Sequence, residues 1–84
     1  MDQDQIATWL YEGAVALQEG NREQALELLL RVVEADETNE EGWLWLSGAV
    51  DDIDDQRTAL QNVLAINPLN HHARYGLEVL SSNP

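Results

Sequence analysis

The sequence has no cysteine and no lysine, and only two prolines interrupt its 84 residues. Without cysteine, neither a disulfide nor a cysteine-based zinc site can stabilise the fold. A chain of this length buries only about 60–65% of its unfolded surface, so it needs close local packing or a stacked neighbour. We therefore predict one small domain that spans residues 1–84.

Positive charge is scarce as well, since four arginines face sixteen acidic residues and the formal net charge is -12. Such a field repels phosphate backbones and anionic lipids, which disfavours nucleic-acid and membrane-surface binding and favours basic partners. No run approaches the ~20 apolar residues of a membrane span, and the first residues do not resemble a secretory signal. We expect a soluble, cytoplasmic protein.

Alanine, leucine, glutamate and glutamine are abundant, and this composition favours helices. Apolar residues recur at three- and four-residue steps in five segments, which predicts five amphipathic helices. Their apolar faces span residues 6–17, 25–33, 43–50, 59–66 and 71–80. Residues 81–84 are expected to be a frayed end or the start of a linker.

Turn and capping residues separate these segments. Gly20 suits a left-handed helix C-terminus, and Asn21 can cap the next helix with Gln24 at the return position of a capping box. Pro68 is expected to end the fourth helix because proline moves the preceding residue out of the α region. Asn70 is a suitable cap for the fifth helix.

Two acidic runs have a structural explanation at helix starts. Asp52 can cap the fourth helix, with other aspartates in its first turn, and Thr38 with Glu41 fits a capping box for the third. The aspartates do not match a calcium loop, which needs a central glycine and a twelfth-position glutamate. Acids at a helix C-terminus are unfavourable, so three acids near the end of the second helix lack such an explanation: Glu34, Asp36 and Glu37.

The chain also aligns with itself. At an offset of 34 residues Trp9 falls on Trp43 and Leu10 on Leu44, and at an offset of 31 Leu29 falls on Leu60. The first helices and the second helices of two units therefore match, with three residues lost between them. The loss predicts a third helix about one turn shorter than the first.

These residues resemble the tetratricopeptide repeat family over nearly the whole chain. The first unit has the family's aromatic, small, turn and core positions, and the second ends in Asn67-Pro68, similar to the family's Asp-Pro ending. The matching residues are Trp9, Gly13, Gly20, Ala25, Leu29, Val32, Trp43, Ser47, Leu60 and Val63. Glu12, Ala16 and Glu37 depart from the pattern. The units look most like short repeats common in filamentous green non-sulfur bacteria.

The resemblance implies an all-α, right-handed stack of antiparallel helix pairs, a tetratricopeptide-like solenoid. Repeat 1 would span about residues 6–39, a shortened repeat 2 about 40–70, and a capping helix about 71–82. The family binds peptides in a concave groove lined by the first helix of each pair. Carried over to this chain, the partner-binding groove is expected to include Leu10, Leu17, Gln18, Glu41, Leu44, Trp45, Asp51, His72 and Tyr75.

Trp43 and Trp45 are two residues apart on one helix and point about 200° away from each other. They are therefore not expected to face the same core. Trp43 occupies the packing position of the repeat. Trp45 either packs within the repeat or is partly exposed as an interface anchor.

Catalytic and cofactor sites are not expected. The chain has no cysteine, few serines, no lysine and no glycine-rich phosphate loop, so neither an activated nucleophile nor a phosphate cradle can be assembled. His71 and His72 are adjacent and diverge on a helix, unlike a helical zinc pair. We expect no enzyme, no metal and no cofactor.

The favoured function is a non-catalytic protein-interaction module, a scaffold or adaptor, that binds a basic or amphipathic partner segment, as a monomer or weak homodimer. One alternative is a structural repeat that self-associates to bury its ends. A remote alternative, based only on net charge, is an acidic mimic of nucleic acid.

Overall fold

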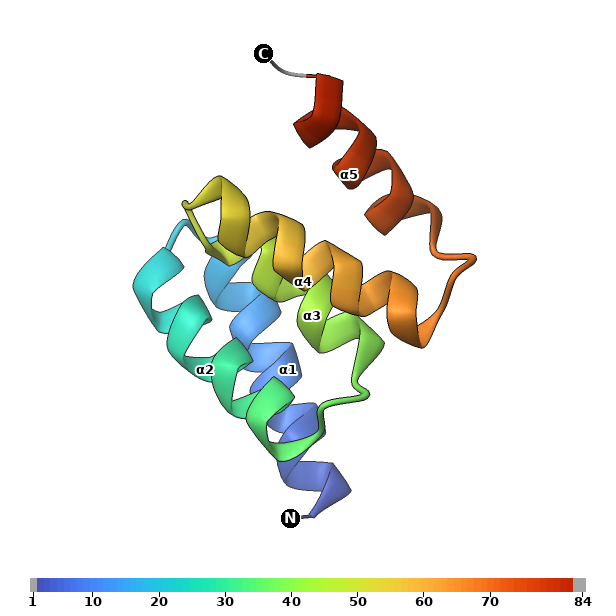
Figure 1. Cartoon of the computed structure of the whole chain (residues 1–84). Coiled ribbons are helices and arrows are strands. Elements are labelled where there is room, and N and C mark those ends of the chain that lie inside the picture. Colours follow the sequence, from blue (N-terminus) through green and yellow to red (C-terminus); the bar gives the residue numbers. More distant parts are fainter. Residues whose placement is uncertain (1, 83–84) are drawn as a thin grey trace.

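The computed structural model describes residues 2–82, which form five α-helices. Each helix packs antiparallel on the one before it, as Figure 1 shows. The all-α prediction is confirmed. The third helix is shorter than the first, as predicted, but with 10 residues against 16 the difference exceeds the expected one turn. The helices are α1 (Gln3–Gln18), α2 (Arg22–Ala35), α3 (Glu40–Ala49), α4 (Ile53–Ile66) and α5 (His71–Ser82).

The first hairpin, α1–α2, forms as its turn residues predict. Gly20 has a φ of 83° and ends α1 in the left-handed region, where a side chain would be strained. The Asn21 side chain accepts a hydrogen bond from the backbone N–H of Gln24 (3.3 Å) and donates one to the Gln24 side chain (2.7 Å). Asn21 therefore caps α2 as predicted, but the return bond of a capping box is not formed, because the backbone N–H of Asn21 donates to the Ala16 carbonyl at 2.8 Å.

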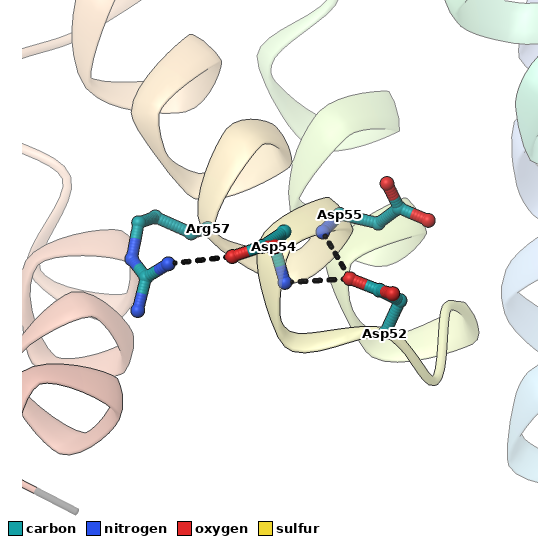
Figure 2. Close-up of polar contacts among 4 residues, drawn as sticks. All are labelled: Asp52, Asp54, Asp55 and Arg57. Carbon is teal, nitrogen blue, oxygen red and sulfur yellow. Dashed lines mark hydrogen bonds and ion pairs between the residues drawn. The ribbon is translucent and has the colours of Figure 1, made fainter.

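The start of α4 also forms as predicted. Asp52 Oδ1 accepts hydrogen bonds from the backbone N–H groups of Asp54 (2.7 Å) and Asp55 (3.2 Å), as Figure 2 shows. Arg57 donates to the Asp54 carboxylate at 3.0 Å. These acids therefore begin a helix, and α3 has already ended before Asp51, which lies in the turn.

The predicted capping box at the start of α3 is wrong. Asn39, not Thr38, caps the helix, and its side-chain oxygen accepts from the backbone N–H of Gly42 at 2.8 Å. Thr38 lies one residue before this cap, and both its N–H (3.1 Å) and its hydroxyl (2.8 Å) donate to the Asp36 carboxylate. Asp36 therefore has a structural role that the sequence did not reveal.

The last helix is longer than its apolar face indicates. Asn70 caps α5 as predicted, accepting from the Ala73 N–H at 2.9 Å. The expectation of fraying from Ser81 is wrong for Ser81 and Ser82, which are helical. The Ser82 hydroxyl donates to the Val79 carbonyl at 3.2 Å and satisfies one of the last backbone groups. Residues 83 and 84 lie outside the described part.

Most of the core consists of two apolar clusters that meet at α3. The first cluster lies among α1, α2 and α3, and its buried members are Ala16, Ala25, Leu29, Val33, Leu46 and Ala49. The second lies between α4 and α5 and comprises Leu60, Val63 and Ala73. Trp43 packs against both clusters. The two helix pairs therefore share one continuous core through α3.

The connections α2–α3 and α4–α5 have the same hydrogen-bonded geometry. Asp36 (φ -144°, ψ 93°) and Asn67 (φ -138°, ψ 94°) end their helices in nearly identical extended conformations. The N–H of Asn39 donates to the Asp36 carbonyl, and the N–H of Asn70 donates to the Asn67 carbonyl, both at 3.1 Å. Asn39 and Asn70 then cap the following helices in the same way.

The second of these connections has an additional anchor in Glu40 on α3. The side-chain amides of Asn70 (2.6 Å) and Asn67 (2.9 Å) both donate to one oxygen of the half-buried Glu40 carboxylate. These two hydrogen bonds, the one from Asn70 first, lower the pKa of Glu40 below its usual value. They join the α4–α5 connection to the start of α3 and help to position α5.

Candidate functional site

Four of the nine predicted groove residues are half-buried against the core. Leu10, Leu17 and Trp45 pack against the first cluster, so α1 and α3 adjoin there. Leu44 packs against the second cluster, to which α5 contributes Ala73. α3 therefore shares the first cluster with α1 and the second cluster with α5. We refer to the predicted groove surface as the α1–α3–α5 face, marked by Leu10, Leu44 and Tyr75.

Four other predicted residues are exposed: Gln18, Glu41, His72 and Tyr75. Tyr75 is 69% exposed and Val79, one turn further along α5, is 44% exposed. Much of the apolar surface of α1 and α3 on this face is already used for internal packing. Tyr75 and Val79 on α5 remain accessible, as does Tyr11 on α1, which is 71% exposed.

Asp51 lies on a different surface from these residues. It forms an ion pair with Arg22 at the start of α2, and the two line a hollow together with Leu26. This ion pair joins the α1–α2 turn to the α3–α4 turn. Asp51 therefore belongs to the side of the molecule formed by α2 and α4.

The two neighbouring tryptophans both contact the first cluster, which corrects the prediction that they cannot share a core. Trp43 and Trp45 are each half-buried and both pack against it. The physical reason is that α3 is the central helix and contacts α1, α2 and α4. The Trp43 indole N–H also donates to the Glu37 carbonyl at 2.9 Å, which satisfies its polar atom.

A groove that the sequence did not predict runs between α2 and α4, with α3 beneath it. Three hollows share lining residues and form it, and we call it the α2–α4 groove. Its apolar lining comprises Leu26, Leu30, Val33, Trp43, Leu46, Ala49, Val50, Ala59, Ala65 and Ile66. Its acidic lining comprises Glu23, Glu34, Glu37, Asp51, Asp52 and Asp55. Leu30 is 40% exposed there.

The acidic residues of this groove have little positive charge near them. Three of the four arginines pair with groups outside the groove lining: Arg31 with Glu27, Arg57 with Asp54, and Arg74 with the Pro68 carbonyl. Arg22 pairs with Asp51, which lines the groove. Arg22 is the one arginine that lines the groove. The groove therefore combines an apolar floor with a largely uncompensated negative rim.

The C-terminal acids of α2 now divide into two kinds. Asp36 organises the α2–α3 connection, whereas Glu34 and Glu37 line the groove beside Trp43. The sequence marked these acids as lacking a structural role at a helix C-terminus. That unfavourable position was the signal that could have located this end of the groove.

Within residues 2–82 there is no group of three or more histidine, aspartate or glutamate side chains placed to hold a metal ion. No charged or polar residue in that range is buried. At the start of α4 the Asp52 carboxylate accepts from the backbone N–H groups of Asp54 and Asp55, and the Asp54 carboxylate accepts from Arg57, as Figure 2 shows. None of the described helices has the length and apolarity that crossing a membrane requires.

The groove depends on contacts between helices that are distant in the sequence, which explains why periodicity did not reveal it. Leu30 and Asp55, for example, line the same hollow from α2 and α4.

Comparison with protein-family models, with curated proteins and with solved structures gave no match.

Proposed function

We propose that the chain is a non-catalytic protein-interaction module built from tetratricopeptide-like units. The observation that carries this proposal is the repeated connection, because Asp36–Asn39 and Asn67–Asn70 make the same backbone and capping hydrogen bonds 31 residues apart. A repeated connection supports a stack of similar helix pairs, in which the same inter-pair geometry is used again. Stacks of this kind present extended surfaces to partner segments.

The partner that the charge distribution favours is basic or amphipathic. The net charge of -12 attracts a cationic segment and speeds its association, and the attraction weakens as salt screens it. The exposed apolar side chains, such as Leu30 and Tyr75, supply contacts that salt does not screen. A segment with both lysine or arginine and an apolar stripe would use both features.

A peptide array tests this function. Amphipathic peptides that differ only in whether their polar face is basic or acidic would be probed at low and moderate salt. We expect the basic members to bind and the acidic members to fail, with partial weakening as salt rises. If no basic amphipathic peptide binds even at low salt, the interaction function is wrong.

A second candidate function, self-association, is favoured by the surface of α5. Residues 71–82 contain one arginine and one glutamate, so the net negative charge lies in the rest of the chain. Tyr75 and Val79 are exposed in this neutral region, and Leu69 next to it is 75% exposed. Two copies could meet there with the least mutual repulsion. Sedimentation at high concentration tests this, and a strict monomer excludes it.

A further inference from the structure

The α2–α4 groove is continuous along its length. Leu30 and Trp43 line both the central hollow and the one towards the C-terminus of α2. Leu26 and Asp55 line both the central hollow and the one at the α3–α4 turn. The three hollows therefore form one surface with an uninterrupted apolar floor, rather than three separate depressions.

The dimensions of the groove fit a short helix. From Asp55 to Ile66 it follows α4 for about 16 Å, the rise of eleven helical residues. This length corresponds to about three turns of a partner helix. An apolar stripe repeating every three or four residues would place several side chains over Leu30 and Trp43.

The elements that frame the groove favour a helical partner over an extended one. Its walls are α2 and α4 and its floor is α3, and the backbone groups inside these helices are paired internally. An extended segment would therefore find no row of backbone donors and acceptors to pair with, as it would at a sheet edge. A helix brings its own backbone hydrogen bonds and needs only side-chain contacts.

Negative charge lies at both ends of the groove. Glu34 and Glu37 line the end near the C-terminus of α2, and Glu23, Asp52 and Asp55 line the end near the α3–α4 turn. The apolar floor lies between them. The complementary ligand therefore has cationic side chains at both ends of a central apolar stripe.

We propose that the α2–α4 groove docks a basic amphipathic helix of another protein, with its apolar stripe on Leu30 and Trp43 and its lysine or arginine side chains on the two acidic ends. This inference rests on the proposed interaction function. It assigns the docking site to α2 and α4 rather than to the α1–α3–α5 face that the sequence indicated.

The test uses a defined probe peptide and two charge-matched variants. The probe is an amidated helix of about 18 residues with leucines on one stripe and lysines towards both ends, and its affinity is measured by calorimetry at low and moderate salt. Leu30→Lys adds a positive charge inside the groove, whereas Tyr75→Lys adds the same charge on α5. Both residues are exposed, and circular dichroism confirms that each variant is folded.

We expect Leu30→Lys to weaken probe binding about tenfold or more and Tyr75→Lys to change it less than about twofold. The reverse order would overturn the groove assignment and leave the interaction function standing. Equal weakening by both variants would show non-specific attraction and would also overturn the assignment. No binding of the probe to the unmodified protein would overturn the interaction function itself.

A second pair of variants tests the acidic ends. The double substitution Glu34→Gln and Glu37→Gln removes two charges that line the groove, and Glu12→Gln with Glu19→Gln removes two charges from α1 and its C-cap. We expect the first pair to weaken probe binding about three- to tenfold and the second less than about twofold, because the attraction falls with distance. Equal effects would contradict placement of the lysines at Glu34 and Glu37.

Discussion

The two sides of α3 show how one helix can serve two different surfaces. Towards α1, Trp45 joins Leu10 and Leu17 in closing the first cluster, so this side is largely used for internal packing. Towards α2 and α4, Trp43 forms the floor of a groove with an acidic rim. Apolar residues alone therefore do not identify a docking surface. The spacing of the neighbouring helices decides which side remains accessible.

The largest effect is expected from the buried core. Two consecutive leucines on α2, Leu29 in the core and Leu30 in the groove, allow the two regions to be compared. Leu29 is fully buried, so Leu29→Ala should lower the free energy of unfolding by about 2–5 kcal/mol. Leu30 is partly exposed, so Leu30→Ala should cost about 1 kcal/mol or less while weakening probe binding. Urea denaturation measures the free energy of unfolding of both variants. Equal losses of stability would contradict the assignment of Leu29 to the core and Leu30 to the groove.

Smaller changes in stability are expected when the two glycines of α3 are replaced by alanine. Gly42 and Gly48 face different neighbours, so the two substitutions compare the two sides of this helix. A Cβ at Gly42 would lie 2.8 Å from Val32 Cγ1, so Gly42→Ala should cost about 1–3 kcal/mol through overpacking against α2. A Cβ at Gly48 would meet only Leu17 Cδ2, at 3.3 Å. Gly48→Ala should leave stability unchanged or raise it by up to about 1 kcal/mol.

Thermal unfolding of the two glycine variants checks this order. The control is the helical content of each variant, which circular dichroism should show to be preserved. A larger loss for Gly48→Ala than for Gly42→Ala would mean that α3 packs more tightly on α1 than on α2.

Lowering the pH should weaken the α4–α5 connection, because Glu40 anchors it through its carboxylate. Because its folded-state pKa is lowered, the Glu40 carboxylate contributes stability above the usual glutamate pKa of 4.5, and this contribution is lost as the pH falls through the lowered pKa. Glu40→Gln removes this dependence. We expect the stability difference between the native protein and the variant to be present at neutral pH and to shrink in acid.

Denaturation at a series of pH values provides the measurement for Glu40. Glu41→Gln is the matched control, since Glu41 is the next residue and is exposed. A difference between the native protein and Glu40→Gln that stays constant down to acid pH would show that the two asparagine amides do not stabilise the charged form.

The smallest effect concerns the arginine that lines the groove. Arg22 pairs with Asp51 on the surface, so Arg22→Ala should change stability by about 1 kcal/mol or less. The substitution frees the Asp51 carboxylate, and probe binding should strengthen about two- to threefold. Arg57→Ala changes the net charge equally, but Arg57 pairs with Asp54 outside the groove lining. Equal strengthening by both variants would contradict a local effect.

Local signals predicted most of the fold. Gly20, Asn21, Asp52 and Asn70 act within a few residues of their own position, so their roles as turn and capping residues could be predicted and are confirmed. Thr38 was assigned the wrong role because Asp36 competes for its donors, and a capping pattern alone does not include that competition.

The candidate site was much less predictable because it depends on residues far apart in the chain. Glu40 accepts hydrogen bonds from residues 27 and 30 positions away, and no local pattern marks such a contact. The groove likewise requires α2 and α4 to stand apart over Trp43. Glu34 and Glu37 are unusual in the sequence because acids are unfavourable at a helix C-terminus, but their position beside Trp43 depends on the three-dimensional arrangement.

Nuclear magnetic resonance of the labelled protein with the basic probe peptide tests the docking site most directly. The Trp43 indole N–H donates to the Glu37 carbonyl at one end of the groove and gives a separate signal, whereas the Tyr75 amide reports on α5. We expect the Trp43 indole and Leu30 amide signals to shift on titration while those of His72 and Tyr75 stay in place. Shifts at His72 and Tyr75 with an unchanged Trp43 indole would contradict docking between α2 and α4.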